Sequence, residues 1–206
     1  MKSDILNLLF DLGNVIVDID IPGAHQRLNQ LLRPDAQQDL IQKVLQDYEC
    51  GRISTDLFIN GLISQSHRDV QALDIIEVWN SILIGAPKHR LKMLEDLKTR
   101  YPVYLLSNTN AMHIEWLHRY FRQQHNVDSF EDRYFTGVYY SHVVGDRKPN
   151  ASIFQFLIED TGLDPRRTLF LDDLQENLDT ARTLGFHTHL VEPSLDVADY
   201  LSNEGY

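Results

Sequence analysis

The chain has 206 residues, of which 43% are hydrophobic and 24% charged, and these proportions exclude disordered, fibrous and disulfide-stapled proteins. Its 30 acidic and 19 basic residues give a formal net charge of -11, which repels nucleic-acid phosphates and anionic lipid over most of the surface. We therefore expect neither a nucleic acid nor a membrane as a partner. An anionic ligand needs a local cluster of donors that overcomes this field.

The cysteine content and the first residues of the chain indicate the cellular compartment of the protein. Cys50 is the only cysteine, so the chain can form neither an intramolecular disulfide nor a cysteine-based zinc site, and a reducing compartment fits. Residues 1–4 lead into an apolar stretch of only six residues, which is too short for a signal peptide or a membrane span. We expect a cytoplasmic protein, and the sequence predicts no oligomeric state.

Several apolar runs of about strand length each end abruptly in a polar residue. They are residues 5–10 before Asp11, 103–106 before Ser107, 135–140 before Ser141 and 169–171 before Asp172, with a fifth candidate at 187–191. Apolar runs without polar alternation are typical of strands covered on both faces, as in a parallel sheet. Helical patterns around residues 91–97, 153–158 and 174–181 lie between the runs. This alternation predicts a doubly wound, Rossmann-like α/β fold.

Three polar residues follow strands of this predicted sheet. In doubly wound sheets, ligands bind beyond the carboxyl ends of the strands, where Asp11, Ser107 and Asp172 emerge. We therefore expect these sequence-distant side chains to converge on one site.

The first two strands are separated by far more chain than a crossover needs. The surplus contains several amphipathic segments punctuated by Pro34, Gly51 and Ser54. We interpret residues 18–97 as an inserted helical cap whose last helix belongs partly to the core. The core then comprises residues 1–17 and 98–206.

Two strand ends carry carboxylates suited to catalysis and metal binding. Asp11 precedes Leu12-Gly13, and a tight turn at this point suits a carboxylate that acts as a nucleophile. An Asp that only caps a turn has the same sequence pattern. Asp172 and Asp173 are adjacent and repel one another unless a cation or a donor network holds them. Oxygen-only ligands favour Mg²⁺, and Asn177, one helical turn beyond Asp173, is placed to steady that carboxylate.

Two loops contain candidate groups for binding a phosphate. Lys148 lies in a loop before a predicted helix, where its charge can neutralise a phosphate. Ser107-Asn108-Thr109-Asn110 offers hydroxyl and backbone N–H groups at another strand end. Each stretch taken alone also fits a solvated polar loop.

Together these motifs resemble the haloacid dehalogenase superfamily. Asp11, Ser107, Lys148-Pro149 and Asp172-Asp173, each with its apolar strand or loop, look like that superfamily's four motifs in the right order and spacing. The insertion is similar to its helical C1-type cap. Residues 10–18, FDLGNVIVD, resemble the subgroup that contains bacterial α-D-glucose-1-phosphate phosphatase.

The resemblance implies a role for each matched residue. Asp11 matches the nucleophile that forms an aspartyl-phosphate, and Lys148 the lysine that neutralises charge. Ser107 matches the phosphate-binding hydroxyl, with Asn108 beside it. Asp11, Asp172 and the backbone carbonyl of Gly13 match the Mg²⁺ ligands, while Asp173 and Asn177 lie around them.

The chain departs from the family pattern at Gly13. Family phosphatases usually carry a second Asp there, whose side chain protonates the leaving oxygen. Such general acid catalysis contributes roughly 10² to 10⁴ in rate, so its loss favours easier leaving groups such as anomeric sugar phosphates, or requires an acid from the cap. Asp18 matches a recurring family Asp and is a candidate for substrate contact or for that acid. The alternative is that Asp18 is only a polar residue of the hinge between core and cap.

We therefore expect a Mg²⁺-dependent phosphohydrolase that acts on a small phosphorylated metabolite, with an anomeric sugar 1-phosphate as the favoured class. A 2-haloacid dehalogenase is a second interpretation, which the Asp172-Asp173 pair disfavours because that chemistry needs no metal. A non-catalytic protein that binds phosphate ligands is a third, and Gly13 is its only support.

Overall fold

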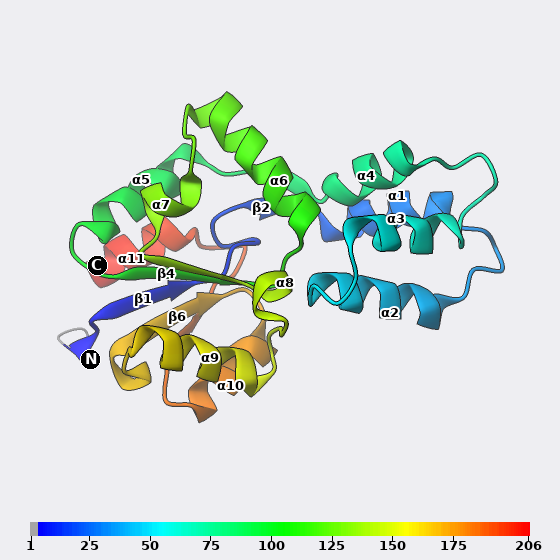
Figure 1. Ribbon diagram of the computed structural model, residues 1–206. Helices are drawn as coiled ribbons and strands as arrows, with labels where there is room; N and C mark the ends of the chain where they lie inside the picture. The colour runs from blue at the N-terminus through cyan, green and yellow to red at the C-terminus, as the bar shows by residue number, and fades with distance from the viewer. Residues whose placement is uncertain (1–3) are drawn as a thin grey trace.

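The computed structural model describes residues 4–206, so residues 1–3, which the sequence prediction assigns to the core, lie outside it. Its centre is a five-stranded parallel sheet with the order β5-β4-β1-β6-β7 (Figure 1). The strands are β1 (Asn7–Phe10), β4 (Val103–Ser107), β5 (Gly137–Tyr140), β6 (Thr168–Asp172) and β7 (His187–Leu190). The first four coincide with apolar runs of the sequence and β7 with the fifth candidate at 187–191, and the predicted doubly wound α/β fold is confirmed.

Helices cover both faces of this sheet. On one face lie α5 (Lys88–Lys98), α6 (Ala111–Tyr120) with a following π-helical turn (Phe121–His125), α7 (Phe130–Tyr134) and α11 (Val197–Glu204). On the other lie α9 (Ala151–Thr161) and α10 (Gln175–Thr183), with a 3-10 turn (Pro165–Arg167) between them. Within β1, Leu8 and Phe10 join the first core cluster and Leu9 the second. This two-sided burial explains why the strands read as continuous apolar runs.

Four helices form a separate unit beside the core, on the side away from the two chain termini (Figure 1). They are α1 (Ile21–Leu31), α2 (Gln38–Glu49), α3 (Thr55–Ile63) and α4 (Ala72–Asn80). Phe58, Leu62 and Ile75 are fully buried in a hydrophobic cluster of this unit, which we call the cap. Its two connections to the core pair as a short antiparallel ribbon of β2 (Asp18–Ile19) and β3 (Leu83–Gly85).

The last helix of the predicted cap lies with the core. The sequence prediction assigns residues 18–97 to the cap, with part of the last helix in the core, and α5 packs against the sheet. Leu91, Leu94 and Leu97 are buried in the same cluster as the strand residues of the core. The period of these leucines predicts the helix, whereas the surface against which it packs is set by tertiary structure. None of the helices between residues 4 and 206 combines the length and apolar character that crossing a bilayer requires.

Two phenylalanines of α9 provide a test of this packing. Phe154 is fully buried between the helix and the sheet, whereas Phe156, two residues on, is 45% exposed. We expect Phe154→Ala to lower the free energy of unfolding by about 3–5 kcal/mol in urea titrations, because it leaves a cavity in the core. Phe156→Ala, the matched control, should cost about 1 kcal/mol or less. Equal losses in the two variants would contradict this account of α9.

Candidate active site

The carboxyl ends of three neighbouring strands place polar side chains at one edge of the sheet. Asp11 directly follows β1, Ser107 ends β4 and Asp172 ends β6, and all three are buried. Asp11 and Ser107 line a cavity of about 370 Å³ that is bounded on its other side by residues of the cap. The sequence prediction that these side chains converge at the strand ends agrees with this arrangement.

Lys148 ties two of these strand ends together. Its ammonium Nζ lies 2.6 Å from Asp11 Oδ1 and 2.7 Å from Asp172 Oδ2, and the side chain is 1% exposed. The Asn108 side chain fixes the backbone at this point, since its Nδ2 donates to the Lys148 carbonyl and its Oδ1 accepts from the Lys148 N–H, both at 2.9 Å. Asn108, predicted to bind phosphate, thus uses its amide to position Lys148.

Burial shapes the charges of this pair. Removal from water raises the pKa of Asp11 to about 7, although the Lys148 ammonium opposes that change. Burial disfavours the charged form of Lys148, but the carboxylates of Asp11 and Asp172 outweigh it and raise the pKa of the lysine. Lys148 therefore carries a positive charge at neutral pH, fixed beside the Asp11 carboxyl group.

Three carboxylates surround a position suited to a cation. Oxygen atoms of Asp11, Asp172 and Asp173 all lie within 4.8 Å of one another, and Lys148 alone does not balance three negative charges. Asn177 Oδ1 is buried without a hydrogen-bond partner, a polar atom that a hydrated cation would satisfy. This oxygen-only donor set fits a hard divalent cation.

The structure corrects the expected partner of Asn177. Its Nδ2 donates to both oxygens of Asp172, at 2.9 and 3.1 Å, and not to Asp173. Asp173 accepts instead from Asn14 Nδ2, at 2.8 Å. Asp172 also accepts from the backbone N–H of Leu174, so its carboxylate is held rigidly at the strand end.

Ser107 is the residue of this site that is open to a ligand. Its side chain lines the cavity, and among residues 4–206 its hydroxyl has no hydrogen-bond partner. Thr109 follows it along the chain, and its backbone N–H donates to Ser141 Oγ at 2.9 Å. The segment after β4 is therefore fixed by its neighbours while one hydroxyl stays available.

Gly13 and Asp18 follow Asp11 in the segment that leads to the cap. A Cβ atom at Gly13 would stand 2.8 Å from Cδ1 of Ile19, so an apolar side chain fills the space into which a residue at 13 would point. Asp18 does not line the cavity. Its Oδ1 accepts from Arg90 at 2.8 Å, which places it in a core ion pair and away from its predicted role at the substrate.

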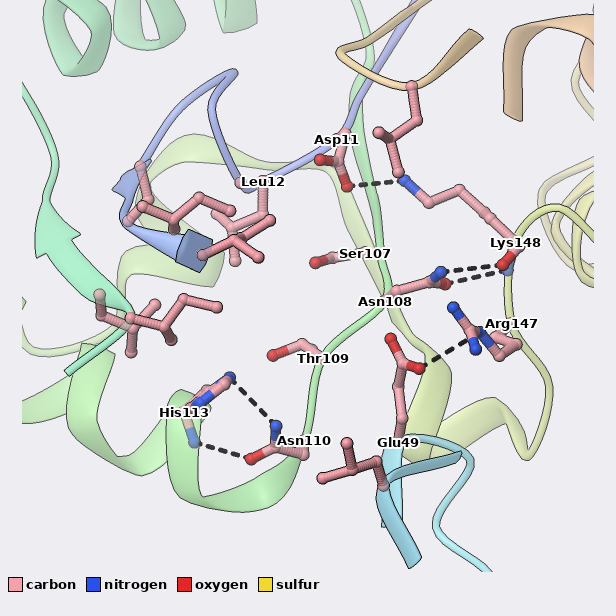
Figure 2. Close-up of a pocket in the computed structure, with 18 of the residues that line it drawn as sticks. Asp11, Leu12, Glu49, Ser107, Asn108, Thr109, Asn110, His113, Arg147 and Lys148 are labelled. Carbon is pink, nitrogen blue, oxygen red and sulfur yellow. Dashed lines mark hydrogen bonds and ion pairs between the residues drawn. The ribbon is translucent and has the colours of Figure 1, made fainter. Parts of the chain in front are cut away.

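Two cap residues close the cavity from the cap side, and sequence reasoning considered Trp79 as a pocket residue but missed Glu49. Glu49, at the end of α2, lies 3.2 Å from Arg147 of the core (Figure 2). Trp79 of α4 donates from Nε1 to Asn110 Oδ1 at 3.3 Å, and its carbonyl lies 3.1 Å from His113 Nε2. No pattern in the cap sequence marks Glu49, because whether it meets the core depends on how the cap docks.

Comparison with known proteins agrees with this geometry. The sequence model for the haloacid dehalogenase-like hydrolases matches residues 5–185, which is most of the chain. The protein belongs to the haloacid dehalogenase-like hydrolase family. The resemblance drawn from the four motifs is thereby confirmed, and the inserted helical cap is consistent with the C1-capped subgroup.

One curated relative is similar over nearly its whole length. It is D-ribitol-5-phosphate phosphatase of Bacteroides thetaiotaomicron, 31% identical over 198 residues that cover 93% of this chain and 94% of the relative.

Solved structures of this family superpose closely. A family enzyme of B. thetaiotaomicron in complex with magnesium has a TM-score of 0.85 at 30% identity, covering 94% of this chain and 96% of that one. The wild-type protein with magnesium and inorganic phosphate has a TM-score of 0.80, covering 94% and 97%. A family hydrolase of Porphyromonas gingivalis has a TM-score of 0.85 at 27% identity over 98% of both chains. An L-2-haloacid dehalogenase of Xanthobacter autotrophicus, at 17% identity and a TM-score of 0.57, shares the fold, covering 89% of this chain and 76% of that one.

The ammonium of Lys148 should be essential for the stability of the metal-free hydrolase. Lys148→Met leaves Asp11 and Asp172 buried without their cation, and we expect it to lower the free energy of unfolding by about 3–5 kcal/mol in urea titrations with EDTA. Adding Asp11→Asn to this variant should restore part of the loss, because it removes one of the unpaired charges. A Lys148→Met variant as stable as the wild type would contradict this assignment.

Proposed function

We propose that the protein is a Mg²⁺-dependent phosphatase that hydrolyses the phosphate monoester of a small sugar or sugar alcohol. The observation that carries this proposal is the site at the strand ends. It combines a buried carboxylate, a lysine held beside it and a cluster of three carboxylates, and Asp11, Lys148 and Asp173 of this set line one cavity. The phosphatase named among the relatives, and the magnesium and phosphate of the related structures, support it.

Each residue of the site has its own role in phosphoryl transfer. Asp11 attacks phosphorus, while Lys148 offsets the repulsion between that carboxylate and the phosphate dianion. Asp11, Asp172 and the Gly13 carbonyl would hold Mg²⁺, which when bound supplies charge stabilisation for the transferred group. The free Ser107 hydroxyl donates to a phosphate oxygen.

The cavity favours a neutral, polar leaving group. Besides Lys148, which is shared between Asp11 and Asp172, Arg147 is the one lysine or arginine among the described lining residues, and the Glu49 carboxyl group lies 3.2 Å from its Nε. The described lining therefore has no cluster of cations that would bind a second phosphate or a carboxylate of the substrate. Gln42 and Gln46 supply hydrogen-bonding groups, and the remaining wall is largely apolar. These features suit hydroxyl groups on a carbon chain.

Two kinds of phosphate ester within this class differ in their leaving group. The sequence predicts an anomeric 1-phosphate, whereas the relative is named for D-ribitol 5-phosphate, a primary alkyl phosphate. The proposed class covers both, and the two differ in how strongly the leaving oxygen needs a proton.

Phosphate release from a panel of esters tests the function. The panel contains p-nitrophenyl phosphate, glucose 1-phosphate, glucose 6-phosphate and D-ribitol 5-phosphate, each with Mg²⁺ or with EDTA. We expect release that requires Mg²⁺ and falls by about 10³-fold or more in Asp11→Asn, because the nucleophile is lost. Asp128→Asn, which removes an exposed carboxylate far out on the surface, is the matched control and should leave the rate unchanged.

Two outcomes would oppose the proposal. Phosphate release that persists in EDTA, or halide release from 2-haloacids without metal, would favour the dehalogenase alternative. Binding of phosphate with Mg²⁺ but no turnover of any ester would favour the non-catalytic one.

A further inference from the structure

An alkyl phosphate needs a proton on its leaving oxygen, and the nucleophile loop does not provide one. Gly13 has no side chain, and Ile19 occupies the space in front of it. The nearby lining residues Leu12 and Val17 are apolar as well. The proton donor must therefore come from another wall of the cavity.

Most titratable groups that line the cavity have other tasks. Asp11 is the nucleophile, Lys148 is shared between two carboxylates, and Asp173 belongs to the carboxylate cluster. His113 is neutral, because burial lowers its pKa to about 4. Both ring nitrogens of His113 are also engaged, Nε2 with the Trp79 carbonyl and Nδ1 with the Asn110 amide.

Glu49 is the carboxyl group that remains among the described lining residues. It ends α2 where the cap meets the core, and its backbone carbonyl accepts from Ser141 Oγ at 2.6 Å. The contact is close, because a Cβ atom at Gly51 would stand 2.0 Å from the His142 carbonyl oxygen. Glu49 therefore has a fixed attachment to the core, so its side chain is held at the cavity.

The Glu49 carboxyl group is not consumed by other partners. Within residues 4–206, its one polar side-chain contact is the 3.2 Å approach of Arg147 Nε. That approach lacks hydrogen-bond geometry, since Arg147 Nε is a buried atom without a hydrogen-bond partner. Figure 2 shows Asp11 and Glu49 on opposite sides of the segment from Ser107 to Thr109, with both carboxyl groups turned toward it.

We propose that Glu49 is the catalytic residue that protonates the leaving oxygen, an inference that rests on the phosphatase function proposed above. Displacement at phosphorus is roughly in line, so the leaving oxygen departs on the side away from Asp11. That side faces the cap, from which Glu49 projects. The cap thus supplies the acid that position 13 lacks.

Glu49 loses its proton in the first step of the reaction and regains one in the second. In the first, Asp11 forms a bond to phosphorus, the ester P–O bond breaks, and the Glu49 proton passes to the leaving alkoxide, which departs as an alcohol. In the second, the Glu49 carboxylate takes a proton from the water that attacks the aspartyl-phosphate. The products are inorganic phosphate, free Asp11 and reprotonated Glu49, so no further reactant is needed.

The surroundings of Glu49 favour its protonated form. Burial raises the pKa of this carboxyl group, against the opposing charges of Arg147 and Lys148. Cys50 is the next residue along the chain. The charge of Arg52 lowers the pKa of its thiol, and that of Asp146 raises it. Activity on an alkyl ester should therefore fall as the pH rises through the pKa of Glu49.

Glu49→Gln separates acid catalysis from a structural role. With Mg²⁺ present, we expect this variant to lower kcat/KM for D-ribitol 5-phosphate by about 10² to 10⁴ and to leave p-nitrophenyl phosphate nearly unchanged, because p-nitrophenolate leaves without a proton. The alkaline decline of the alkyl-ester profile should disappear with it. Asp39→Asn, which removes an exposed carboxylate in the first turn of α2, should change neither substrate.

Arg147→Gln provides an independent arm. Removing the cation beside Glu49 should raise the pKa of Glu49 and so shift the alkaline decline of the alkyl-ester profile to higher pH, whereas loss of the acid abolishes this decline. If the ion pair only holds the cap, Glu49→Gln and Arg147→Gln will slow both substrates alike, and the proposal is wrong. Wild-type turnover of the aryl ester without any alkyl ester also overturns it, whereas failure of every ester disproves the phosphatase function itself.

Discussion

The ammonium of Lys148 is the contact on which the active site depends. It joins carboxylates that follow β1 and end β6, although residues 11, 148 and 172 are far apart in the sequence. Without it, negative charges would be buried together with no compensation, a cost of several kcal/mol per ion. The parallel sheet brings the strand ends together, and the lysine makes that convergence energetically tolerable.

The surrounding hydrogen bonds serve to keep this lysine and its partners in place. Asn108 holds both backbone polar groups of Lys148, and Asn177 holds both oxygens of Asp172. These amides come from the segment after β4 and from α10, so the charged atoms have little freedom to relax away from one another. A site organised in this way before the substrate arrives needs little rearrangement during the reaction.

The sequence predicts the core better than it predicts the details of the site. Apolar runs locate the strands because both faces of the sheet are buried, and the polar residues at their ends follow from that topology. The partner of Asn177 was mispredicted, since sequence spacing does not say which of two adjacent carboxylates turns toward the helix. Asp18 and Glu49 show the same limit. Only tertiary packing determines that Asp18 pairs with Arg90 and that Glu49 lines the cavity.

The ribbon of β2 and β3 has a consequence for how the cap moves. Both chain crossings between cap and core lie in this one ladder, with the Asp20 N–H donating to the Ile82 carbonyl just beyond it. The two crossings therefore bend together, as a single hinge and not as two independent tethers. Because β2 begins seven residues after Asp11, a swing of the cap also pulls on the loop that carries Asp11. Opening of the cap and relaxation of the Asp11 loop are in this way one mechanical event.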